Sequence, residues 1–375
     1  MKEVIKRRKN ICLYSILLLS LGLLFPACHK EENLVIYTEV LEKNDFGGAI
    51  LKLSPEEMKD ADFEFGDILQ VSFNDTVLKI PYFDGFYCRV GDMQLTAYRS
   101  SPNIEFTAPF CGLPDALDVR KGTEIAIAMF EKGSAKNIQQ TMAMNFSNDF
   151  SDYEYDTIRF SNARMVKLGR IAGNRLYRSS SPFDNAYNRA DFAALFMRKK
   201  GIACALNLSD DDVKMQSMLD DMPEYSRQFY ESGNVVCCKL KVNYKSDETN
   251  VMMLQGLVKM IEKQGPYLVQ CLEGKDRTGY ACAILEAICG ATYDEIVADY
   301  MLSYENYFNY NQYNNPTFYN TVVSIRLNDA LMYYCGIDDE SLLPTIDLEA
   351  SVRRFMLNHG LTETEIDQLQ QALCD

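Results

Sequence analysis

The stretch LVQCLEGKDRTGYACAILEAI, residues 268–288, decides the fold of this chain. An apolar, strand-like run ends at Cys271, five residues around Gly274 follow, and an RTG triplet then opens an apolar, helix-like run. A strand that leads through a tight loop into a helix is typical of a parallel α/β sheet. Ligands bind at the carboxyl ends of the strands in such sheets. We therefore expect Cys271 to lie at a ligand-binding edge.

The sequence around this stretch alternates between strand-like and helix-like runs. The strand-like runs carry little polar alternation, as expected for strands that are buried on both faces; they are RLYRS (175–179), IACALNLS (202–209), VVCCKLKV (235–242) and PYLVQC (266–271). The helix-like runs are residues 189–201, 211–231, 248–265 and 277–290. This alternation predicts an α/β domain with a mostly parallel sheet and a helical C-terminus over residues 157–375.

A second pattern occupies the N-terminal part of the chain. Short β-rich runs are punctuated by turn residues, which predicts a smaller, compact antiparallel β-rich domain over residues 33–146. The last of these runs is QQTMAMNF (139–146). We identify no catalytic group of residues in this domain. The polar segment SNDFSDYEYD (147–156) is predicted to be the linker between the two domains.

The first 27 residues have the pattern of an export signal. Five basic side chains precede an apolar run from Ile11 to Phe25, and Pro26-Ala27-Cys28 follows. The apolar run is short for a spanning helix, which needs about 20 residues. The ending resembles a bacterial lipoprotein box, which implies cleavage after residue 27 and lipidation of Cys28. An uncleaved anchor and a plain secretory signal are the alternatives. We expect an exported lipoprotein, held at the periplasmic or cell-surface side of a membrane by this lipid alone.

The net charge of the chain excludes some classes of binding partner. The formal net charge is −15, and removal of residues 1–27, with five basic and one acidic side chain, makes it −19. So acidic a surface repels nucleic acid and anionic membranes. His29 and His359 are the only histidines, and no cysteine pair has metal-ligand spacing. We expect no nucleic-acid partner, metal or cofactor.

The loop after Cys271 has the residue types of an anion site. Backbone N–H groups of a tight loop can turn inward as a nest, and the following helix adds its positive end. Gly274 permits the tight backbone, and the planar fork of Arg277 can grip two phosphate oxygens. The same field favours the thiolate form of a cysteine. The pattern predicts that Cys271 attacks the phosphorus of a bound phosphate ester.

CLEGKDRTG resembles the phosphate-binding loop of the cysteine-dependent protein tyrosine phosphatases, in the bacterial branch that carries Lys-Asp-Arg in the loop. YRSSSP (177–182), ALNLSDDD (205–212) and GATYDEIVADYM (290–301) resemble the same branch. The likeness covers roughly residues 160–310. One position departs from the family pattern, because Gln270 stands where the family has His before the nucleophile.

The resemblance implies a role for each loop residue. Cys271 is the nucleophile that forms a phosphocysteine, Arg277 stabilises the transferred group, and Thr278 supports the leaving thiolate. Lys275 is a trait of relatives that also accept phosphoinositides. Asn207 or Arg178 braces the loop. The phosphate-binding segment comprises Leu272, Glu273, Gly274, Lys275, Asp276 and Arg277.

Two carboxyl groups are candidates for protonating the leaving group. Asp276 lies inside the loop, as the acid does in relatives with Lys-Asp-Arg. Asp247, in NYKSDETN, lies where many other tyrosine phosphatases keep a mobile acid loop; its alternative role is to start a helix, because SDETNVMM resembles a helix N-terminus. We favour Asp276. The triplet Asp210 to Asp212 is interpreted as helix capping.

These observations predict a protein tyrosine or dual-specificity phosphatase that hydrolyses phosphate monoesters of proteins or small molecules. The first alternative is a phosphoinositide or inositol phosphate phosphatase, which Lys275 favours and Glu273 disfavours. The second is a catalytically weak phosphate-binding module, suggested by Gln270 and the attached β-rich domain. The segment YENYFNYNQYNNP (304–316) is interpreted as a surface connection, with a substrate-facing aromatic loop as the alternative.

Overall fold

The computed structural model describes residues 34–44, 47–98 and 101–374. The chain divides into two compact units. Among the described residues, the first unit holds those from 34 to 87 together with those from 92 to 139, and the second holds Cys88–Gly91 together with those from 140 to 374. The predicted signal segment and Cys28 lie outside the described residues.

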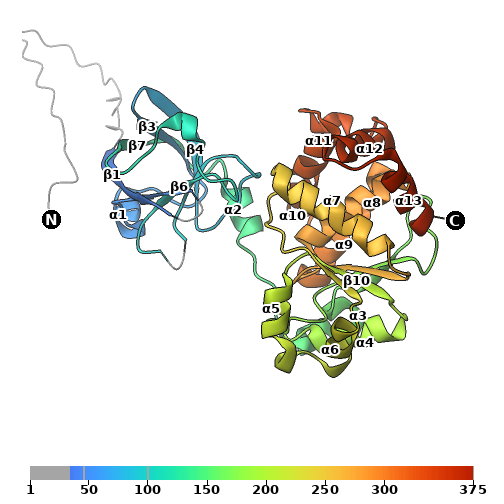
Figure 1. Ribbon diagram of the computed structural model, residues 1–375. Helices are drawn as coiled ribbons and strands as arrows, with labels where there is room; N and C mark the ends of the chain where they lie inside the picture. Colours follow the sequence, from blue (N-terminus) through green and yellow to red (C-terminus); the bar gives the residue numbers. More distant parts are fainter. Residues whose placement is uncertain (1–33, 45–46, 99–100, 375) are drawn as a thin grey trace, which may run out of the picture. The chain divides into compact units, whose positions relative to one another are not determined.

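The first unit is a closed barrel (Figure 1) with the strand order β1-β2-β6-β5-β4-β3-β7. The strands are β1 (Val35–Lys43), β2 (Ala49–Leu51), β3 (Ile68–Phe73), β4 (Thr76–Phe83), β5 (Gln94–Thr96), β6 (Glu105–Thr107) and β7 (Glu124–Glu131). Neighbouring strands are antiparallel except β4 and β5, which pair in parallel. Alternate side chains of β3 fill the interior, since Leu69, Val71 and Phe73 are buried. The predicted β-rich domain is thus a barrel with one parallel pair.

The second unit is built on a five-stranded sheet with the order β11-β10-β12-β9-β8. Its strands are β8 (Arg164–Val166), β9 (Leu176–Ser179), β10 (Cys204–Asn207), β11 (Val235–Cys237) and β12 (Tyr267–Gln270). The four predicted strands pair in parallel, and β8 adds an antiparallel edge strand that the sequence pattern did not indicate. The sheet is therefore mixed, and the prediction of a mostly parallel sheet is confirmed in part.

Helices pack on both faces of this sheet (Figure 1). Two large apolar clusters separate at the sheet: β12 contributes Leu268 to the cluster with α4 and α6, and Val269 to the cluster with α7 and α8. The helices before the loop are α3 (Thr157–Phe160), α4 (Ala190–Lys199), α5 (Asp212–Ser217), α6 (Glu224–Glu231) and α7 (Asp247–Ile261). Those after it are α8 (Asp276–Ile288), α9 (Tyr293–Phe308), α10 (Pro316–Val322), a π-helix (Val323–Asn328), α11 (Asp329–Cys335), α12 (Leu348–Asn358) and α13 (Glu363–Leu373).

Two connecting segments differ from their predictions. QQTMAMNF begins within the helix α2 (Lys136–Met142), because Gln and Met favour helices and nothing in the run fixes a strand period. The predicted linker 147–156 is folded into the second unit, where Tyr153 is buried and its hydroxyl accepts a 3.0 Å hydrogen bond from Arg189. Arg189 also donates to the Ser147 carbonyl at 2.8 Å, so a buried cation holds the segment.

The prediction for YENYFNYNQYNNP is also corrected. Its first five residues form the last turn and a half of α9, and Tyr304 and Tyr307 are each 5% exposed. Asn309 then ends the helix in the left-handed conformation, and Asn315 caps α10. Within the described residues, no helix combines the length and apolarity that crossing a membrane requires.

Candidate active site

Cys271 lies where the sequence predicted it, between the inner strand β12 and the helix α8. The residue is 3% exposed and packs with Val269 in the apolar cluster that surrounds α8. From Thr278 to Ile288, every residue of α8 is buried, as expected for a helix that is apolar all round. Strand and helix therefore hold both ends of the loop rigidly.

Gly274 permits the sharp turn in the middle of the loop. Its φ of +64° lies in the left-handed region. A Cβ at this position would lie 2.2 Å from the Ser179 carbonyl oxygen, at the end of β9. Any side chain would therefore push the loop off the neighbouring strand.

The first two carbonyl groups of the loop are bound from outside. The backbone N–H of Ser181 donates to the Leu272 carbonyl at 3.2 Å. The hydroxyl of Tyr307, on α9, donates to the Glu273 carbonyl at 2.5 Å. Both contacts turn carbonyl oxygens away from the loop interior.

The next two carbonyl groups are bound in the same way. Asn162 donates from Nδ2 to the Gly274 carbonyl at 3.0 Å, and Arg178 donates from Nη2 to the carbonyls of Gly274 and Lys275 at 3.0 and 3.3 Å. Two loop amides have protein acceptors, since Leu272 N–H donates to the Ser209 hydroxyl at 2.7 Å and Gly274 N–H donates to the Cys271 carbonyl at 3.2 Å. Outward carbonyls favour inward-directed amides at the other loop positions, and α8 adds its positive end at the same place. The loop thus has the backbone arrangement of an anion nest.

A buried ion network supports Arg178. Asp299, on α9, binds Arg178 at 2.5 Å and Arg164 at 2.7 Å, and none of these three side chains is more than 10% exposed. Burial alone would raise the pKa of Asp299, but the two guanidinium groups hold it below its usual value. Burial and the nearby Asp299 raise the pKa of Glu286 well above its usual value, which favours the neutral form of that carboxyl. Two buried cations thus share the Asp299 carboxylate, which holds Arg178 in place behind the loop.

Arg277 and Thr278 follow the loop in the first turn of α8. Arg277 is partly exposed and donates from Nη1 to the Leu240 carbonyl at 3.3 Å, so its guanidinium is reachable from solvent. The hydroxyl of Thr278 is buried and has no hydrogen-bond partner among the described residues. A free buried hydroxyl directly after the nucleophile loop suits the role of thiolate support.

Gln270, which stands where the family has His, has a buried side-chain amide. Both polar atoms of its fully buried amide are without a hydrogen-bond partner in the described part of the chain. Because side chains alternate along a strand, Gln270 points to the face of Leu268, opposite the face that holds Cys271. The side-chain amide of Gln270 therefore does not hydrogen-bond the loop in the described part of the chain.

Lys275 directs its ammonium group into the protein. Its Nζ lies 2.9 Å from Glu273 Oε2 and 3.8 Å from Asp276 Oδ2, and its side chain is 12% exposed. Burial would lower the pKa of Lys275, but these carboxylates raise it well above its usual value. Three aromatic rings have centroids 5.1–5.9 Å from Nζ, those of Phe146, Tyr304 and Phe308. The lysine charge is thus largely compensated within the loop.

Asp276 is the first residue of α8, and its side chain is 30% exposed. Its Oδ1 accepts hydrogen bonds from the hydroxyls of Tyr304, at 2.9 Å, and Tyr300, at 3.4 Å. Burial would raise the pKa of Asp276, but the charges of Lys275 and Arg326 and the Tyr304 hydroxyl hold it below its usual value. These groups therefore favour the charged form of Asp276, and the carboxyl must bind a proton before it can act as a general acid.

Asp247 has different neighbours. It is the first residue of α7, after the cap Ser246, and its side chain is 86% exposed. Its recorded partners are the Tyr333 hydroxyl at 3.4 Å and His359 Nε2 at 3.5 Å, both in the C-terminal helical region. Of the two predicted acids, only Asp276 is in the loop that carries Cys271.

The positioning residues were largely missed from the sequence. Arg178 was one of the two predicted braces, whereas Asn207 instead shapes the turn after β10 by accepting from the N–H of Ser209 at 2.9 Å. Ser209 then accepts from the N–H of Leu272 at 2.7 Å. Asp299 had a detectable signal, because it is a charged residue on the apolar face of an amphipathic helix. The predicted cap Asp211 is confirmed.

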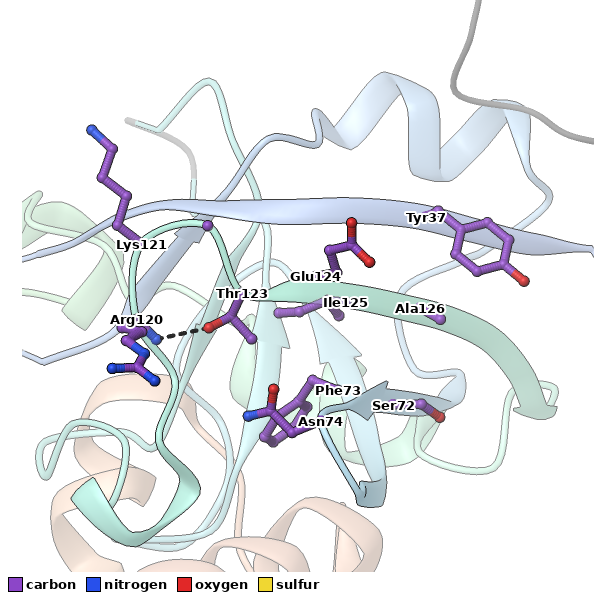
Figure 2. A pocket seen from close by; sticks show the side chains of 11 residues that line it. Tyr37, Ser72, Phe73, Asn74, Arg120, Lys121, Thr123, Glu124, Ile125 and Ala126 are labelled. Atoms are coloured by element: carbon purple, nitrogen blue, oxygen red, sulfur yellow. Dashed lines mark hydrogen bonds between the residues drawn. The ribbon is translucent and has the colours of Figure 1, made fainter.

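The barrel has a surface hollow of about 610 Å³ (Figure 2). Its lining comprises Tyr37, Ser72, Phe73, Asn74, Arg120, Lys121, Gly122, Thr123, Glu124, Ile125 and Ala126. The N–H of Arg120 donates to the Thr123 hydroxyl at 3.0 Å, and the Arg120 guanidinium pairs with Asp118 at 3.2 Å. None of the described residues that line it is Cys or His, so the lining offers neither residue as a nucleophile or base.

Comparison with solved structures finds low similarity. An uncharacterized conserved protein from Thermotoga maritima is 19% identical with a TM-score of 0.24; the match covers 25% of this chain and 35% of that one, about a third of its length. The core catalytic domain of a PP-IP phosphatase from S. cerevisiae is 15% identical with a TM-score of 0.28, over 48% of this chain and 91% of that one. At these TM-scores neither likeness supports a conclusion about this chain.

Comparison with protein families gives a more specific result. No curated protein matches the chain. The model of the tyrosine phosphatase family matches residues 207–375, a little under half of the sequence. The matched range includes β12, the loop and α8, and it supports a cysteine-based phosphatase. Over the part of the chain that carries Cys271, Asp276 and Arg277, this protein is thus similar to the tyrosine phosphatase family.

Proposed function

We propose that this chain is a cysteine-dependent phosphatase of the protein tyrosine or dual-specificity type, in the branch with Lys-Asp-Arg in the loop. The observation that carries the proposal is the binding of all four carbonyls between Leu272 and Lys275 from outside the loop. That arrangement leaves the amides of Glu273 and Lys275, the Arg277 side chain and the N-terminus of α8 to bind a phosphate group beside Cys271.

The reaction would proceed in two steps. The Cys271 thiolate attacks phosphorus, the ester P–O bond breaks, and the leaving oxygen takes a proton from Asp276. Water then attacks the phosphocysteine, releasing phosphate and the thiolate, which Thr278 supports. Arg277 binds the equatorial oxygens in both steps and stabilises the developing charge.

The substrate is proposed to be a phosphorylated protein or a small phosphate monoester. The alternative of a phosphoinositide or inositol phosphate draws support from the lysine in the loop. Against it, Lys275 lies 2.9 Å from Glu273 and in contact distance of aromatic rings, so little of its charge is available to a second phosphate group. The compensated charge of Lys275 therefore favours a monoester with a single phosphate.

One assay distinguishes an active phosphatase from the third possibility, a phosphate-binding module without useful turnover. We expect hydrolysis of p-nitrophenyl phosphate by the wild-type protein without added metal, and loss of turnover in Cys271→Ser. Binding of orthophosphate should survive in Cys271→Ser, because the nest and Arg277 remain. Activity near wild type in Cys271→Ser, or dependence on a divalent metal, would place the chemistry elsewhere.

We also propose that the protein is an exported lipoprotein, anchored through Cys28 on the periplasmic or cell-surface side. The basic and apolar pattern of residues 1–27 supports this proposal. Cys28→Ser should move the protein from the membrane fraction to the soluble fraction. Unchanged partition of Cys28→Ser between the fractions would rule out the lipid anchor.

A further inference from the structure

One face of α9 presents three tyrosines to the phosphate-binding loop. Tyr300, Tyr304 and Tyr307 are spaced by four and three residues, so their side chains lie along one helix face, and none is more than 5% exposed. The Tyr307 hydroxyl binds the backbone of Glu273, whereas the other two hydroxyls bind the side chain of Asp276. The proposed reaction assigns no chemical step to any of these three tyrosines.

The two oxygens of Asp276 have different surroundings. Oδ1 accepts both tyrosine hydroxyls, and the shorter bond, 2.9 Å, comes from Tyr304. Oδ2 lies 3.8 Å from the Lys275 ammonium, beyond hydrogen-bond distance. Since a tyrosine hydroxyl that donates to Oδ1 excludes a proton there, Oδ2 is the oxygen on which Asp276 can carry a transferable proton.

We propose that Tyr304 is a positioning residue for proton delivery, because its hydroxyl fixes Oδ1 of Asp276 and leaves Oδ2 to protonate the leaving group. This inference rests on the proposed function, in which Asp276 is the acid. The sulfur of Cys271 forms a bond to phosphorus, the ester P–O bond breaks, and the proton on Oδ2 moves to the leaving oxygen. The products of the step are an alcohol, a phosphocysteine and an Asp276 carboxylate that still accepts from Tyr304.

The hydrogen bond also affects acid strength. A donor that binds the charged form of a carboxyl favours that form, and the Tyr304 hydroxyl is one of the groups that lower the pKa of Asp276. Removal of the hydroxyl should therefore raise the pKa of Asp276 and weaken it as an acid. Because a general acid is active only when protonated, the alkaline limb of the pH–rate profile should move to higher pH.

Tyr304→Phe tests the proposal directly. The variant keeps the ring whose centroid lies 5.1 Å from Lys275 Nζ and removes only the hydroxyl. We expect the alkaline limb of kcat/KM to move to higher pH. We also expect turnover of an alkyl phosphate to fall by roughly tenfold relative to turnover of p-nitrophenyl phosphate, since only a basic leaving oxygen needs the proton.

Tyr307→Phe is the matched control on the same helix. Its hydroxyl binds the Glu273 carbonyl and not Asp276, so its loss should change both substrates equally and leave the limb in place. A limb in Tyr304→Phe that coincides with that of the wild type, or an unchanged ratio of the two substrates, would overturn the inference. Wild-type activity that does not depend on Cys271 would instead refute the proposed function.

A second variant keeps the inference testable if Tyr304→Phe does not fold, which thermal unfolding would reveal. Tyr300 donates to the same Oδ1 over the longer distance of 3.4 Å. Tyr300→Phe should therefore shift the alkaline limb in the same direction by a smaller amount. An unmoved limb in Tyr300→Phe, with Tyr304→Phe unfolded, would count against a tyrosine-held acid.

Discussion

The helices α7 and α8 of the α/β unit both begin with an aspartate, yet their first turns differ. The start of α7 is closed by a side-chain cap, because Ser246 Oγ accepts from the N–H of Thr249 at 3.3 Å. The start of α8 has Lys275 at the cap position and no capping side chain. Asp247 is 86% exposed, whereas Asp276 is 30% exposed. The same residue at the same helix position thus lies in two different environments.

This difference indicates which features allow the N-terminus of a helix to bind a ligand. The positive end of any helix attracts an anion, and a side-chain cap satisfies that end within the protein. At α8, hydrogen bonds go instead to the carbonyls of the preceding loop, through Arg178 and Asn162, and the first N–H groups are left for a ligand. A helix start that is braced from behind and uncapped in front is therefore suited to bind phosphate.

The largest expected effect is on proton transfer. Asp276→Asn should lower turnover of an alkyl phosphate by roughly 10²–10⁴-fold and cost far less on p-nitrophenyl phosphate. The alkaline limb of the pH–rate profile should vanish in Asp276→Asn and persist in Asp247→Asn. Steady-state kinetics of both variants over a pH series would measure this. The opposite result, with the leaving-group dependence in Asp247→Asn, would make the start of α7 the acid site.

The second-largest expected effect is on the free energy of unfolding, through the ion network behind the start of α8. Asp299→Asn would leave the buried cations of Arg164 and Arg178 without their carboxylate, which should lower the free energy of unfolding by about 3–5 kcal/mol. Urea denaturation at neutral pH would measure the loss. Asp294→Asn, an exposed position in the first turn of α9, is the matched control and should cost far less. Equal losses in the two variants would mean that the network does not support the fold.

The difference in the free energy of unfolding between wild type and Asp299→Asn should depend on pH. The folded-state pKa of Asp299 is lowered, so its contribution to stability is present above the pKa of an unfolded aspartate, about 3.9, and is lost as pH falls toward the folded value. The difference between wild type and Asp299→Asn should therefore shrink below about pH 4. A difference that grows on acidification would contradict an ionised Asp299.

The sequence predicted the start of α8 because its signals are local. An apolar strand, a glycine that needs positive φ and an apolar helix follow one another within residues 268–288, and backbone preferences alone place them in order. The alternation of strands likewise predicted the parallel part of the sheet. The short strand β8 and the helix α2 were missed because three-residue strands and Gln- and Met-rich runs carry no clear period.

The surroundings of the loop could not be predicted in the same way. Tyr304 and Asp299 lie 28 and 23 residues beyond Asp276, on a helix whose orientation depends on packing across the whole apolar cluster. The tyrosine-rich end of α9 has the composition of a surface loop, and only its burial reveals hydrogen bonds to the site. Tertiary contacts of this kind decide whether an aspartate is an acid or a cap.

The third expected effect is the stabilisation of the protein by phosphate bound at the uncapped N-terminus of α8. Orthophosphate at one hundred times its dissociation constant should raise the free energy of unfolding by about 2.7 kcal/mol. Arg277→Ala should reduce this gain, because it removes the planar fork that binds phosphate oxygens. Thermal unfolding with phosphate, against sodium chloride at matched ionic strength, would measure it. Equal stabilisation of wild type and Arg277→Ala would place the anion away from the loop.

The smallest effect is expected at the capped start of α7. Ser246→Ala removes the hydroxyl that accepts from Thr249 and should lower the free energy of unfolding by about 1 kcal/mol, the usual cost of losing a serine cap. Activity and phosphate stabilisation should not change, because the partners of this helix start are Tyr333 and His359 rather than the loop. Thermal unfolding and p-nitrophenyl phosphate turnover on one preparation would test both statements. If turnover of an alkyl phosphate fell while the aryl ester was unaffected, Asp247 would take part in proton transfer, and the contrast between the two helix starts would no longer hold.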